Sequence, residues 1–307
     1  MEKKVIIITG ANCGIGLEAA KGLCELGHDV VVTTRDDSKG EATVAAIKAE
    51  VPDANVMYLT AELSDPQSIR DFVEKFKSTG KKLDILVNNA GLFMKYSSAD
   101  RHTARNDPSY EVTMTVNCMG PFLLTNLLLD ELKATGTKES PSRIVNVSSS
   151  ITVMFKQDNS KRPFYIDDLM LTEQGHYVSG MQSYRNSKLA LNLWSNEMAK
   201  QLEGSHVIIN TLCPGFIPST GLARDSVTSR FGSIMMSILD SFIGRALVKT
   251  SPVSEGRRRI VSMCVDEETK TCGLFYHRSK PTPEAAEVLN SDHKEKIWAL
   301  CVKYSGL

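Results

Sequence analysis

The sequence predicts an α/β fold in which a doubly wound parallel sheet of about seven strands carries helices on both faces. Short β-branched segments such as 5–9 and 29–34 alternate along the chain with segments of helical periodicity. A glycine-rich turn follows the first of these strands directly. No linker, repeat or low-complexity segment divides the 307 residues, so we expect one domain over 1–307.

The first strand and the turn behind it predict a dinucleotide site. The strand 5–9 leads into Gly10-Ala11-Asn12-Cys13-Gly14-Ile15-Gly16, and an apolar helix comes next. Backbone N–H groups and the positive end of a helix dipole would face a pyrophosphate here, as in a Rossmann-type nucleotide-binding unit. The alternative is a simple tight turn. Cys13 is interpreted as a small packed thiol rather than a nucleophile.

The second strand, expected over 29–34, favours NADP(H) over NAD(H). A carboxylate at its end would accept a hydrogen bond from the ribose 2′-hydroxyl of NAD. Here Thr34 and Arg35 stand at that point, and the first acidic residues, Asp36 and Asp37, follow them. The guanidinium of Arg35 could pair with a 2′-phosphate. The alternative is that Arg35 is merely a solvated residue at a strand end.

The alternation of strands and helices continues beyond the second strand. We expect a helix over 39–50, a strand over 55–59, a helix from Pro66 to about Ser78 behind the N-cap Asp65, and a strand over 83–87. The turn Asn88-Asn89-Ala90-Gly91 closes that last strand. This turn and Glu62 fall at the carboxyl ends of the strands, where an open parallel sheet binds its ligand.

A helical pattern over 110–132 contains Pro121. Because proline has no N–H, the carbonyl of Asn117 would lose its helical partner. The free carbonyl and the amide side chain of Asn117 could together hold a water molecule. The alternative is a plain kink that packs against the sheet.

Two further strands end in candidate site residues. The strand 143–147 runs into Ser148-Ser149-Ser150, where one hydroxyl could donate to a substrate oxygen. The alternative is that these serines only serve the turn, which serine favours without any catalysis. The strand 206–212 ends in Cys213-Pro214-Gly215, again at the predicted ligand edge.

The last part of the chain predicts a cover and a closing set of elements. Apolar side chains at helical spacing within 216–250 predict a cover over a cleft or, alternatively, ordinary core. The run 257–259, three arginines, is interpreted as the solvated face of a helix over 254–264. A last strand is expected over 271–276, and a terminal helix within 284–304.

A tyrosine and a lysine four residues apart carry the catalytic hypothesis. Tyr184 and Lys188 share one face of a predicted helix, because side chains at i and i+4 lie above one another. An ammonium about 4 Å from a phenol stabilises phenolate by as much as ~4 kcal/mol at an effective dielectric of 20. The pKa of Tyr184 would then fall, and the phenol could exchange a proton near neutrality. The alternative is a solvated pair on a helix surface.

Composition narrows the classes of function. The chain has 36 basic and 36 acidic residues, so it lacks the charge footprint of a protein that binds nucleic acid or an anionic membrane. Its seven cysteines have no metal-ligand spacing, which predicts no metal site and reduced thiols in the cytoplasm. The first strand begins at Val5, and no run of 18 apolar residues follows, so we expect a soluble protein without a signal peptide or membrane anchor.

Four motifs stand in a fixed order along the chain. They are Thr9-Gly10-x-x-x-Gly14-Ile15-Gly16, Asn88-Asn89-Ala90-Gly91, a serine behind the fifth strand, and Tyr184-x-x-x-Lys188. Together they resemble the short-chain dehydrogenase/reductase family over essentially the whole chain. The segments 120–129, 214–222 and 297–298 look most like the branch that contains retinol dehydrogenases and light-dependent protochlorophyllide reductases.

The resemblance implies a catalytic tetrad of Asn117, Ser149, Tyr184 and Lys188, with Ser148 and Ser150 as alternatives to Ser149. In the family, Tyr is the acid, Ser holds the carbonyl oxygen, Lys contacts the nicotinamide ribose and lowers the Tyr pKa, and Asn supports Lys through water. With Arg35, the expected NADP(H) contacts are Gly10, Asn12, Cys13, Gly14, Ile15, Gly16, Arg35, Glu62, Leu63, Asn89, Ala90, Gly91, Tyr184, Lys188, Pro214, Gly215, Ile217, Ser219 and Thr220.

Three departures from the branch affect the expected substrate. Retinol dehydrogenases of this branch usually carry an N-terminal membrane segment, the segment 95–108 is longer than usual, and Glu62 stands where Asp is commoner. We expect an NADP(H)-dependent oxidoreductase, monomer or homodimer, that interconverts a lipophilic aldehyde or ketone and its alcohol. The alternatives are reduction of a conjugated C=C bond and an NADP-binding scaffold or sensor with little turnover.

Overall fold

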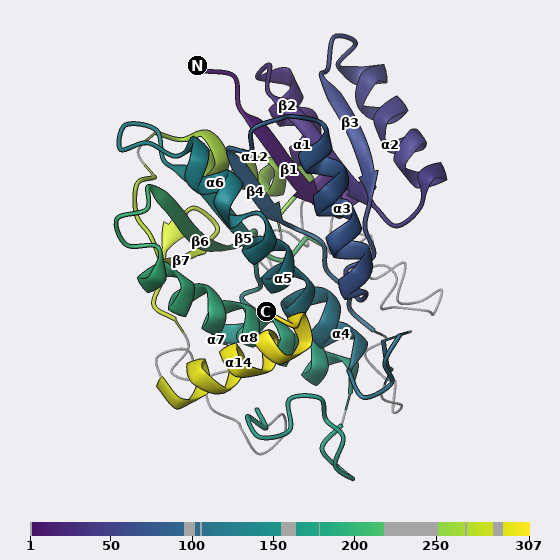
Figure 1. The fold of residues 1–307 in the computed structure, drawn as a ribbon, viewed down its shortest axis with the longest axis vertical. Coiled ribbons are helices and arrows are strands. Elements are labelled where there is room, and N and C mark those ends of the chain that lie inside the picture. Colours follow the sequence, from purple (N-terminus) through teal and green to yellow (C-terminus); the bar gives the residue numbers. More distant parts are fainter. Residues whose placement is uncertain are drawn as a thin grey trace.

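An eight-stranded sheet forms the centre of the molecule in the computed structural model, which describes residues 2–94, 102–104, 106–154, 164–177, 179–217, 251–267, 269–284 and 291–307. Its order is β3-β2-β1-β4-β5-β6-β7-β8 (Figure 1). The strands are β1 (Val5–Thr9), β2 (Asp29–Thr34), β3 (Val56–Thr60), β4 (Ile85–Asn88), β5 (Ser142–Val147), β6 (Val207–Cys213), β7 (Phe275–His277) and β8 (Lys280–Pro281).

The predicted doubly wound parallel sheet is confirmed, with one additional strand. β1 to β7 pair in parallel, and the chain reverses its direction of travel across the sheet between β3 and β4, which places β1 beside β4. The eighth strand, β8, pairs antiparallel with β7 through Tyr276 and Pro281. It spans two residues, which is too short to leave a periodic pattern in the sequence.

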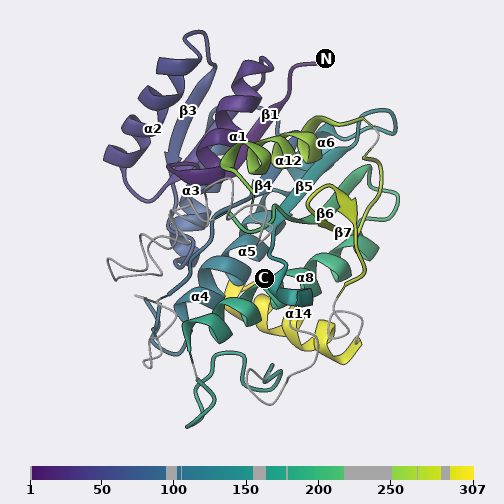
Figure 2. The same cartoon turned by 180° about the vertical axis from the view of Figure 1, so that it is seen from behind.

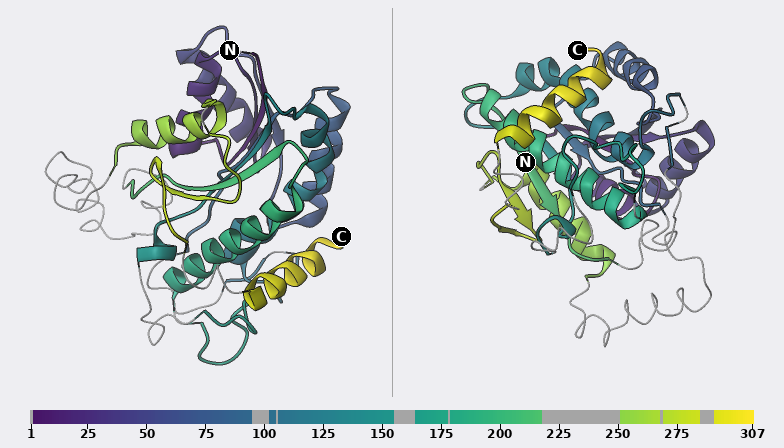
Figure 3. Two further views of the ribbon diagram at one scale, coloured as in Figure 1. Left: turned by 90° about the vertical axis from the view of Figure 1, so that its left-hand side faces the viewer. Right: turned by 90° about the horizontal axis from the view of Figure 1, so that it is seen from below.

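Helices cover both faces of the sheet. α3 (Pro66–Ser78), α5 (Gly120–Leu127), α6 (Leu129–Thr135), α8 (Gly180–Gln201) and α14 (Ser291–Ser305) form one layer (Figure 1). α1 (Gly14–Glu25), α2 (Asp37–Glu50) and α12 (Val253–Val265) form the other (Figure 2). Figure 3 shows the sheet edge-on between the two layers.

Alternation along the strands divides the apolar core into two parts. Successive side chains of a strand point to opposite faces, so Ile7 packs with the α3, α5 and α8 layer, while Ile6 and Ile8 pack with the α1 and α12 layer. Each of these three side chains is fully buried. The strands therefore read as continuous apolar runs, as expected where both faces of a parallel sheet are covered.

The predicted helical stretch over 110–132 is divided in the structure. α4 (Val112–Met114) passes into η1 (Thr115–Met119), a π-helical turn, and Pro121 then lies in the first turn of α5. Because Pro121 has no N–H, it fits the start of a helix better than its interior. Among the described residues, no single helix has the length and apolar composition of a membrane span. Among the described helices, Val112–Leu127 and Leu129–Thr135 reach this length and composition only when they are taken together, and the pair is bent by 53°.

Most of the predicted cover segment lies outside the described residues, which end at 217 and resume at 251. A short helix, α7 (Ile151–Met154), follows the serines behind β5. The helix predicted over 254–264 is α12, and the terminal helix is α14. The last parallel strand is shorter than the predicted 271–276, because only Phe275–His277 pair with β6.

Candidate active site

Tyr184 and Lys188 lie at the carboxyl ends of the central strands, on the same side of the molecule as the glycine turn. Asn89, directly behind β4, donates through Nδ2 to the carbonyl of Gly10 at 3.2 Å. Four residues later, the ring of Phe93 packs against the ring of Tyr184, with centroids 5.0 Å apart. The segment behind β4 therefore connects the glycine turn with the helix that carries the tyrosine and the lysine.

Helix α8 places both side chains inside the molecule. Ser179 caps its first turn by accepting from the N–H of Gln182 at 3.3 Å. Lys188 Nζ donates to the carbonyl of Val147 at the end of β5, at 2.8 Å. The same nitrogen lies 6.0 Å from the centroid of the Tyr184 ring. The alternative interpretation of Tyr184 and Lys188 as a solvated pair on a helix surface is wrong, since both residues are buried.

The three serines behind β5 have three different partners. Ser149 shares a side-chain hydrogen bond with Tyr184. Ser148 Oγ donates to Asn192 Oδ1 at 2.6 Å, and Ser150 shares a hydrogen bond with the thiol of Cys213. Of the three, Ser149 is the one that the structure brings to the phenol, as the family resemblance implies.

Asn117 holds the segment behind β4 against α8. Its Oδ1 accepts from the N–H of Leu92 at 2.6 Å, and its Nδ2 donates to the carbonyl of Leu92 at 2.8 Å and to Ser187 Oγ at 2.9 Å. The amide side chain thus reaches the neighbour of Lys188 directly. Asn117 sits in the π-helical turn η1, four residues before Pro121, and the water expected at its carbonyl stays a prediction.

Burial sets the protonation of the tyrosine and the lysine. It raises the pKa of Tyr184 above its ordinary value, and the hydrogen bond from Ser149 opposes this shift only in part. It lowers the pKa of Lys188 from 10.5 to about 8. The expected fall in the pKa of Tyr184 is therefore not found in this structure. The physical reason is that removal of the phenolate from water outweighs an ammonium that is itself buried and bonded to Val147.

The glycine turn leaves the start of α1 without a side-chain cap. Cys13 occupies the N-cap position, makes no capping hydrogen bond there and is exposed, and the first turn has no acidic residue. By contrast, α2, α3 and α8 are capped by Asp36, Asp65 and Ser179. The first N–H groups of a helix have no partner within it. The turn from Gly10 to Gly16, with Asn12 exposed and Ile15 half-buried, therefore fits a pyrophosphate.

The turn behind β4 fixes the end of β1. Thr9 Oγ1 accepts from the N–H groups of Asn89 and Ala90, both at 3.0 Å. Asn89 Nδ2 returns a hydrogen bond to the carbonyl of Thr9 at 2.8 Å. Gly91, next along the chain, is exposed. Asn89 and Ala90 thus hold the glycine turn in place, while Gly91 faces solvent at the same edge.

The edge behind β2 and β3 bears on the choice between NAD(H) and NADP(H). Arg35 is exposed directly behind β2. Asp36 is already engaged, because it accepts from the N–H of Lys39 at 2.9 Å and pairs with its ammonium at 2.8 Å. Glu62 Oε1 accepts from Ser64 at 2.9 Å, and Leu63 is buried. Asp36 is thus already paired with Lys39, whereas the exposed guanidinium of Arg35 can meet a ligand.

The turn behind β6 is held by a residue that the sequence interpretation placed elsewhere. Arg259 of α12 donates through Nη1 to the carbonyl of Pro214 and is buried. The interpretation of 257–259 as a wholly solvated face is therefore wrong for this residue, because α12 packs beside the turn. Gly215 adopts a φ of +91°, and Ile217 is buried. The predicted Ser219 and Thr220 lie outside the described residues.

Several contacts of the site were not predicted. Leu92, Phe93, Val147 and Ser187 all touch a member of the proposed tetrad. Ser187 had a signal, since it precedes Lys188 on the helix face of Tyr184. Backbone partners such as the carbonyl of Val147 have none, because a carbonyl is present at every position. In the described ranges, no three His, Cys, Asp or Glu side chains gather as a metal site.

The sequence matches the model of a known family and two known enzymes over most of their length. A family model described as short chain dehydrogenase matches residues 4–160. Retinol dehydrogenase 12 of Mus musculus is 39% identical over 306 residues, which cover 99% of this chain and 87% of that protein. The chloroplastic protochlorophyllide reductase of Chlamydomonas reinhardtii is 30% identical over 322 residues, which cover 100% of this chain and 79% of that protein.

A solved structure gives the same fold. L-Sorbose reductase from Gluconobacter frateurii, complexed with NADPH and L-sorbose, matches with a TM-score of 0.69 at 20% identity. The match covers 94% of this chain and 98% of that one. At such an identity, the likeness concerns the arrangement of strands and helices alone.

Proposed function

The chain belongs to the short-chain dehydrogenase family, and from this premise we propose that it is an NADP(H)-dependent oxidoreductase that interconverts a lipophilic aldehyde or ketone and its alcohol. One observation carries the proposal. Tyr184 is buried, bonded to Ser149 and close to Lys188, at the sheet edge that also holds the uncapped start of α1. A proton donor and a dinucleotide cradle thus share one edge.

The residues divide the reaction between them. When bound, the nicotinamide supplies the hydride to the carbonyl carbon. Tyr184 Oη donates its proton to the carbonyl oxygen, and Ser149 Oγ donates a hydrogen bond to the same oxygen. Lys188 keeps a positive charge near the oxygen while that oxygen gains electron density. Asn117 acts one step back, through its hydrogen bond to Ser187.

The protonation of the site supports reduction. A raised pKa keeps the phenol of Tyr184 protonated at neutral pH, which is the form that gives a proton to an alkoxide. Oxidation of an alcohol would need the opposite form. The site thus holds Tyr184 in the form that the reduction of a carbonyl compound requires.

Two features support the cofactor and the substrate class. Arg35 is exposed behind β2 while Asp36 is engaged by Lys39, which supports a 2′-phosphate over a free 2′-hydroxyl. NADPH is bound in the L-sorbose reductase complex of the same fold. A lipophilic substrate fits the likeness to retinol dehydrogenases and the Phe93 ring beside Tyr184.

A second candidate is reduction of a conjugated C=C bond, which the full-length likeness to a protochlorophyllide reductase favours. Both candidates use the same cofactor, so the product distinguishes them. An alcohol supports the first candidate, and a saturated carbonyl or ring supports the second.

The decisive experiment is turnover on a panel of aliphatic and aromatic aldehydes, ketones and enones with NADPH, followed by product identification. We expect NADPH oxidation and an alcohol product from at least one apolar carbonyl compound. Tight binding of NADPH without oxidation on any member of the panel would contradict the proposal and favour a cofactor-bound scaffold or sensor.

A further inference from the structure

Three consecutive arginines on α12 have different surroundings. Arg257 pairs with Glu25 at the end of α1. Arg258 has a side chain that is 58% exposed and pairs with Glu255 at 2.9 Å. The side chain of Arg259 is only 8% exposed. Of the three guanidinium groups, Arg259 alone is enclosed by the protein, so its position needs a reason that the other two do not.

The guanidinium of Arg259 joins the turn behind β6 to the start of α12. Nη1 donates to the carbonyl of Pro214 and, at 3.0 Å, to Ser251 Oγ. Nη2 donates to Glu255 Oε2 at 3.0 Å. Ser251 is itself fixed, because its N–H donates to the carbonyl of Phe216 at 2.8 Å. The turn is therefore held from both of its ends by one network.

Burial of a guanidinium is costly, and burial lowers the pKa of Arg259 accordingly. The charge of Glu255 opposes this shift. Arg259 is bonded through Nη1 and Nη2, while its Nε has no partner among the described residues. A buried, bonded charge adds little net stability compared with an apolar residue of similar size, although it fixes the geometry of its partners. The arrangement is thus better suited to orienting the Pro214 carbonyl than to stabilising the fold.

Gly215 shows how closely the guanidinium approaches the turn. A Cβ at this position would lie 3.1 Å from Arg259 Nη1 and 3.1 Å from Ser251 Oγ. The φ of +91° disfavours any L side chain as well. The backbone of the turn is therefore pressed against Arg259 without a side chain between them.

The same part of α12 also touches the glycine turn. A Cβ at Gly256, one helical turn before Arg259, would meet Ile217 Cδ1 at 2.7 Å and Ile15 Cγ2 at 3.0 Å. α12 thus contacts the turn that would bind the pyrophosphate and the turn that would border the nicotinamide. Its first two turns set the spacing between them.

We propose that Arg259 is a positioning residue for the nicotinamide end of the cofactor, because it fixes the Pro214 carbonyl and the backbone of the 214–217 turn relative to the glycine turn. The inference rests on the proposed function. It predicts a defect confined to the nicotinamide half of the dinucleotide, since the adenosine half is proposed to bind at Arg35, behind β2, and β2 is separated from β6 by three strands.

The test compares Arg259→Met with Arg258→Met, which lies on the same helix and removes a pair with the same glutamate. Affinity is measured for NADPH and for adenosine 2′,5′-bisphosphate, which lacks the nicotinamide. We expect Arg259→Met to weaken NADPH binding about tenfold and to leave the bisphosphate within about twofold of wild type. Arg258→Met should leave both within about twofold. Arg259→Lys, which keeps one donor, should fall between wild type and Arg259→Met.

The outcomes separate this inference from the proposed function. Wild type that binds neither probe would overturn the proposed function and, with it, the role of Arg259. Wild-type binding together with unchanged NADPH affinity in Arg259→Met would overturn the role of Arg259 alone. Equal loss of both probes would show a purely structural part and would also overturn it. If Arg259→Met does not fold, the same two affinities are measured for Arg259→Lys and Ser251→Ala. We then expect a smaller loss of NADPH affinity, again without a loss of affinity for the bisphosphate.

Discussion

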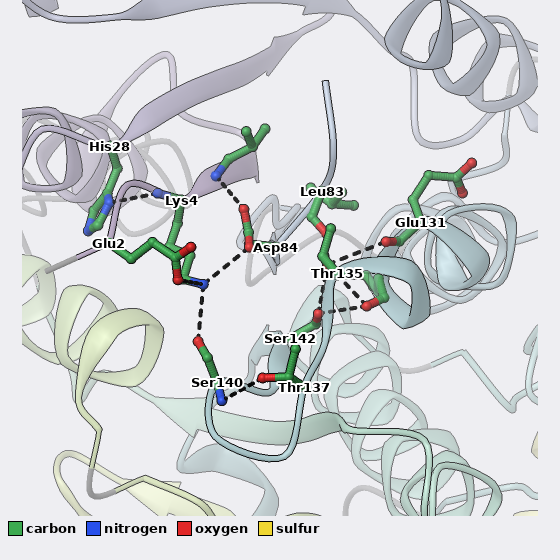
Figure 4. Close-up of polar contacts among 12 residues, drawn as sticks. Glu2, Lys4, His28, Leu83, Asp84, Glu131, Thr135, Thr137, Ser140 and Ser142 are labelled. Carbon is green, nitrogen blue, oxygen red and sulfur yellow. Dashed lines mark hydrogen bonds and ion pairs between the residues drawn. The ribbon is translucent and has the colours of Figure 1, made fainter. Parts of the chain in front are cut away.

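The two ends of the sheet use polar groups in opposite ways. At the amino end, Lys4 Nζ contacts Asp84 at 3.3 Å, Ser140 at 3.0 Å and Glu2 at 3.2 Å, and Asp84 also accepts from the N–H of Val5 at 2.8 Å (Figure 4). These contacts tie the start of β1 to the start of β4 and to the segment before β5. Charges at this end neutralise one another within the protein.

At the carboxyl end, polar groups are held in place without being fully satisfied by the protein. Lys188 is a buried ammonium whose pKa falls to about 8. Tyr184 is a buried phenol bonded to Ser149, and the start of α1 has no side-chain cap. Donors and acceptors that the fold leaves unmatched remain available to a ligand.

The comparison teaches that stability and chemistry are located at different ends of the same strands. Substitutions at the carboxyl end should change activity with little loss of stability or even a gain. Substitutions at the amino end should do the reverse. Four predictions test this separation, in order of decreasing effect.

Tyr184→Phe should reduce kcat about 10³-fold, because it removes the proton donor and general acid–base catalysis contributes roughly that much. NADPH affinity and the melting temperature should stay close to wild type, since Phe keeps the packing against Phe93. Steady-state kinetics, cofactor titration and thermal melting check the three expectations. Activity within tenfold of wild type would show that another group gives the proton.

Lys188→Met should raise stability at neutral pH, with a sign fixed by the pKa. The pKa of Lys188 is lowered from 10.5 in the unfolded chain to about 8 in the fold, so the unfolded chain holds the proton more tightly. The deficit of wild type relative to the variant, about 3 kcal/mol, should be complete below pH 8 and disappear as the pH rises toward 10.5. Chemical denaturation of both proteins across this range measures it. A difference that stays constant over this range would show that folding does not lower the pKa of Lys188.

Asp84→Ala should cost about 2 kcal/mol of stability, because it removes the acceptor of the Val5 N–H and one of the three contacts of the Lys4 ammonium. Turnover per folded molecule should equal that of wild type. Urea denaturation and kinetics below the transition check both. Loss of turnover without loss of stability would break the proposed separation of the two ends.

Arg35→Asp should shift the ratio of kcat/KM for NADPH over NADH by about tenfold or more toward NADH, equal to about 1.4 kcal/mol. The physical reason is that a carboxylate repels a 2′-phosphate and accepts from a 2′-hydroxyl. Because Arg35 is exposed, the melting temperature should not change. An unchanged ratio would mean that another group reads the phosphate.

The fold and the family could be predicted from local patterns. Strands 5–9 and 29–34 agree with the structure residue for residue, and the family model and relatives confirm the resemblance. These features can be recognised from residues that lie close together in the sequence. The sequence predicted a doubly wound parallel sheet, but it did not predict the order of the strands or which residues pair between neighbouring strands.

What could not be predicted depends on distant parts of the chain. The choice among Ser148, Ser149 and Ser150 needs the position of α8, and the pKa of Tyr184 needs its burial. Arg259 had an unused signal, since Gly256, Arg259, Ile260 and Met263 follow the i, i+3, i+4, i+7 spacing of a buried face. An arginine in such a stripe is placed on the core side of its helix.

The π-helical turn Thr115–Met119 makes this segment sensitive to the insertion or deletion of a single residue. Loss of one residue here would convert the turn into an ordinary α-helical one, because a π-helical turn holds one residue more than an α-helical turn. The π-turn that orients Asn117 toward Leu92 and Ser187 would then be lost, and we expect these hydrogen bonds to be lost with it. Such a deletion would separate the segment behind β4 from α8, the two parts of the proposed active site that Asn117 joins.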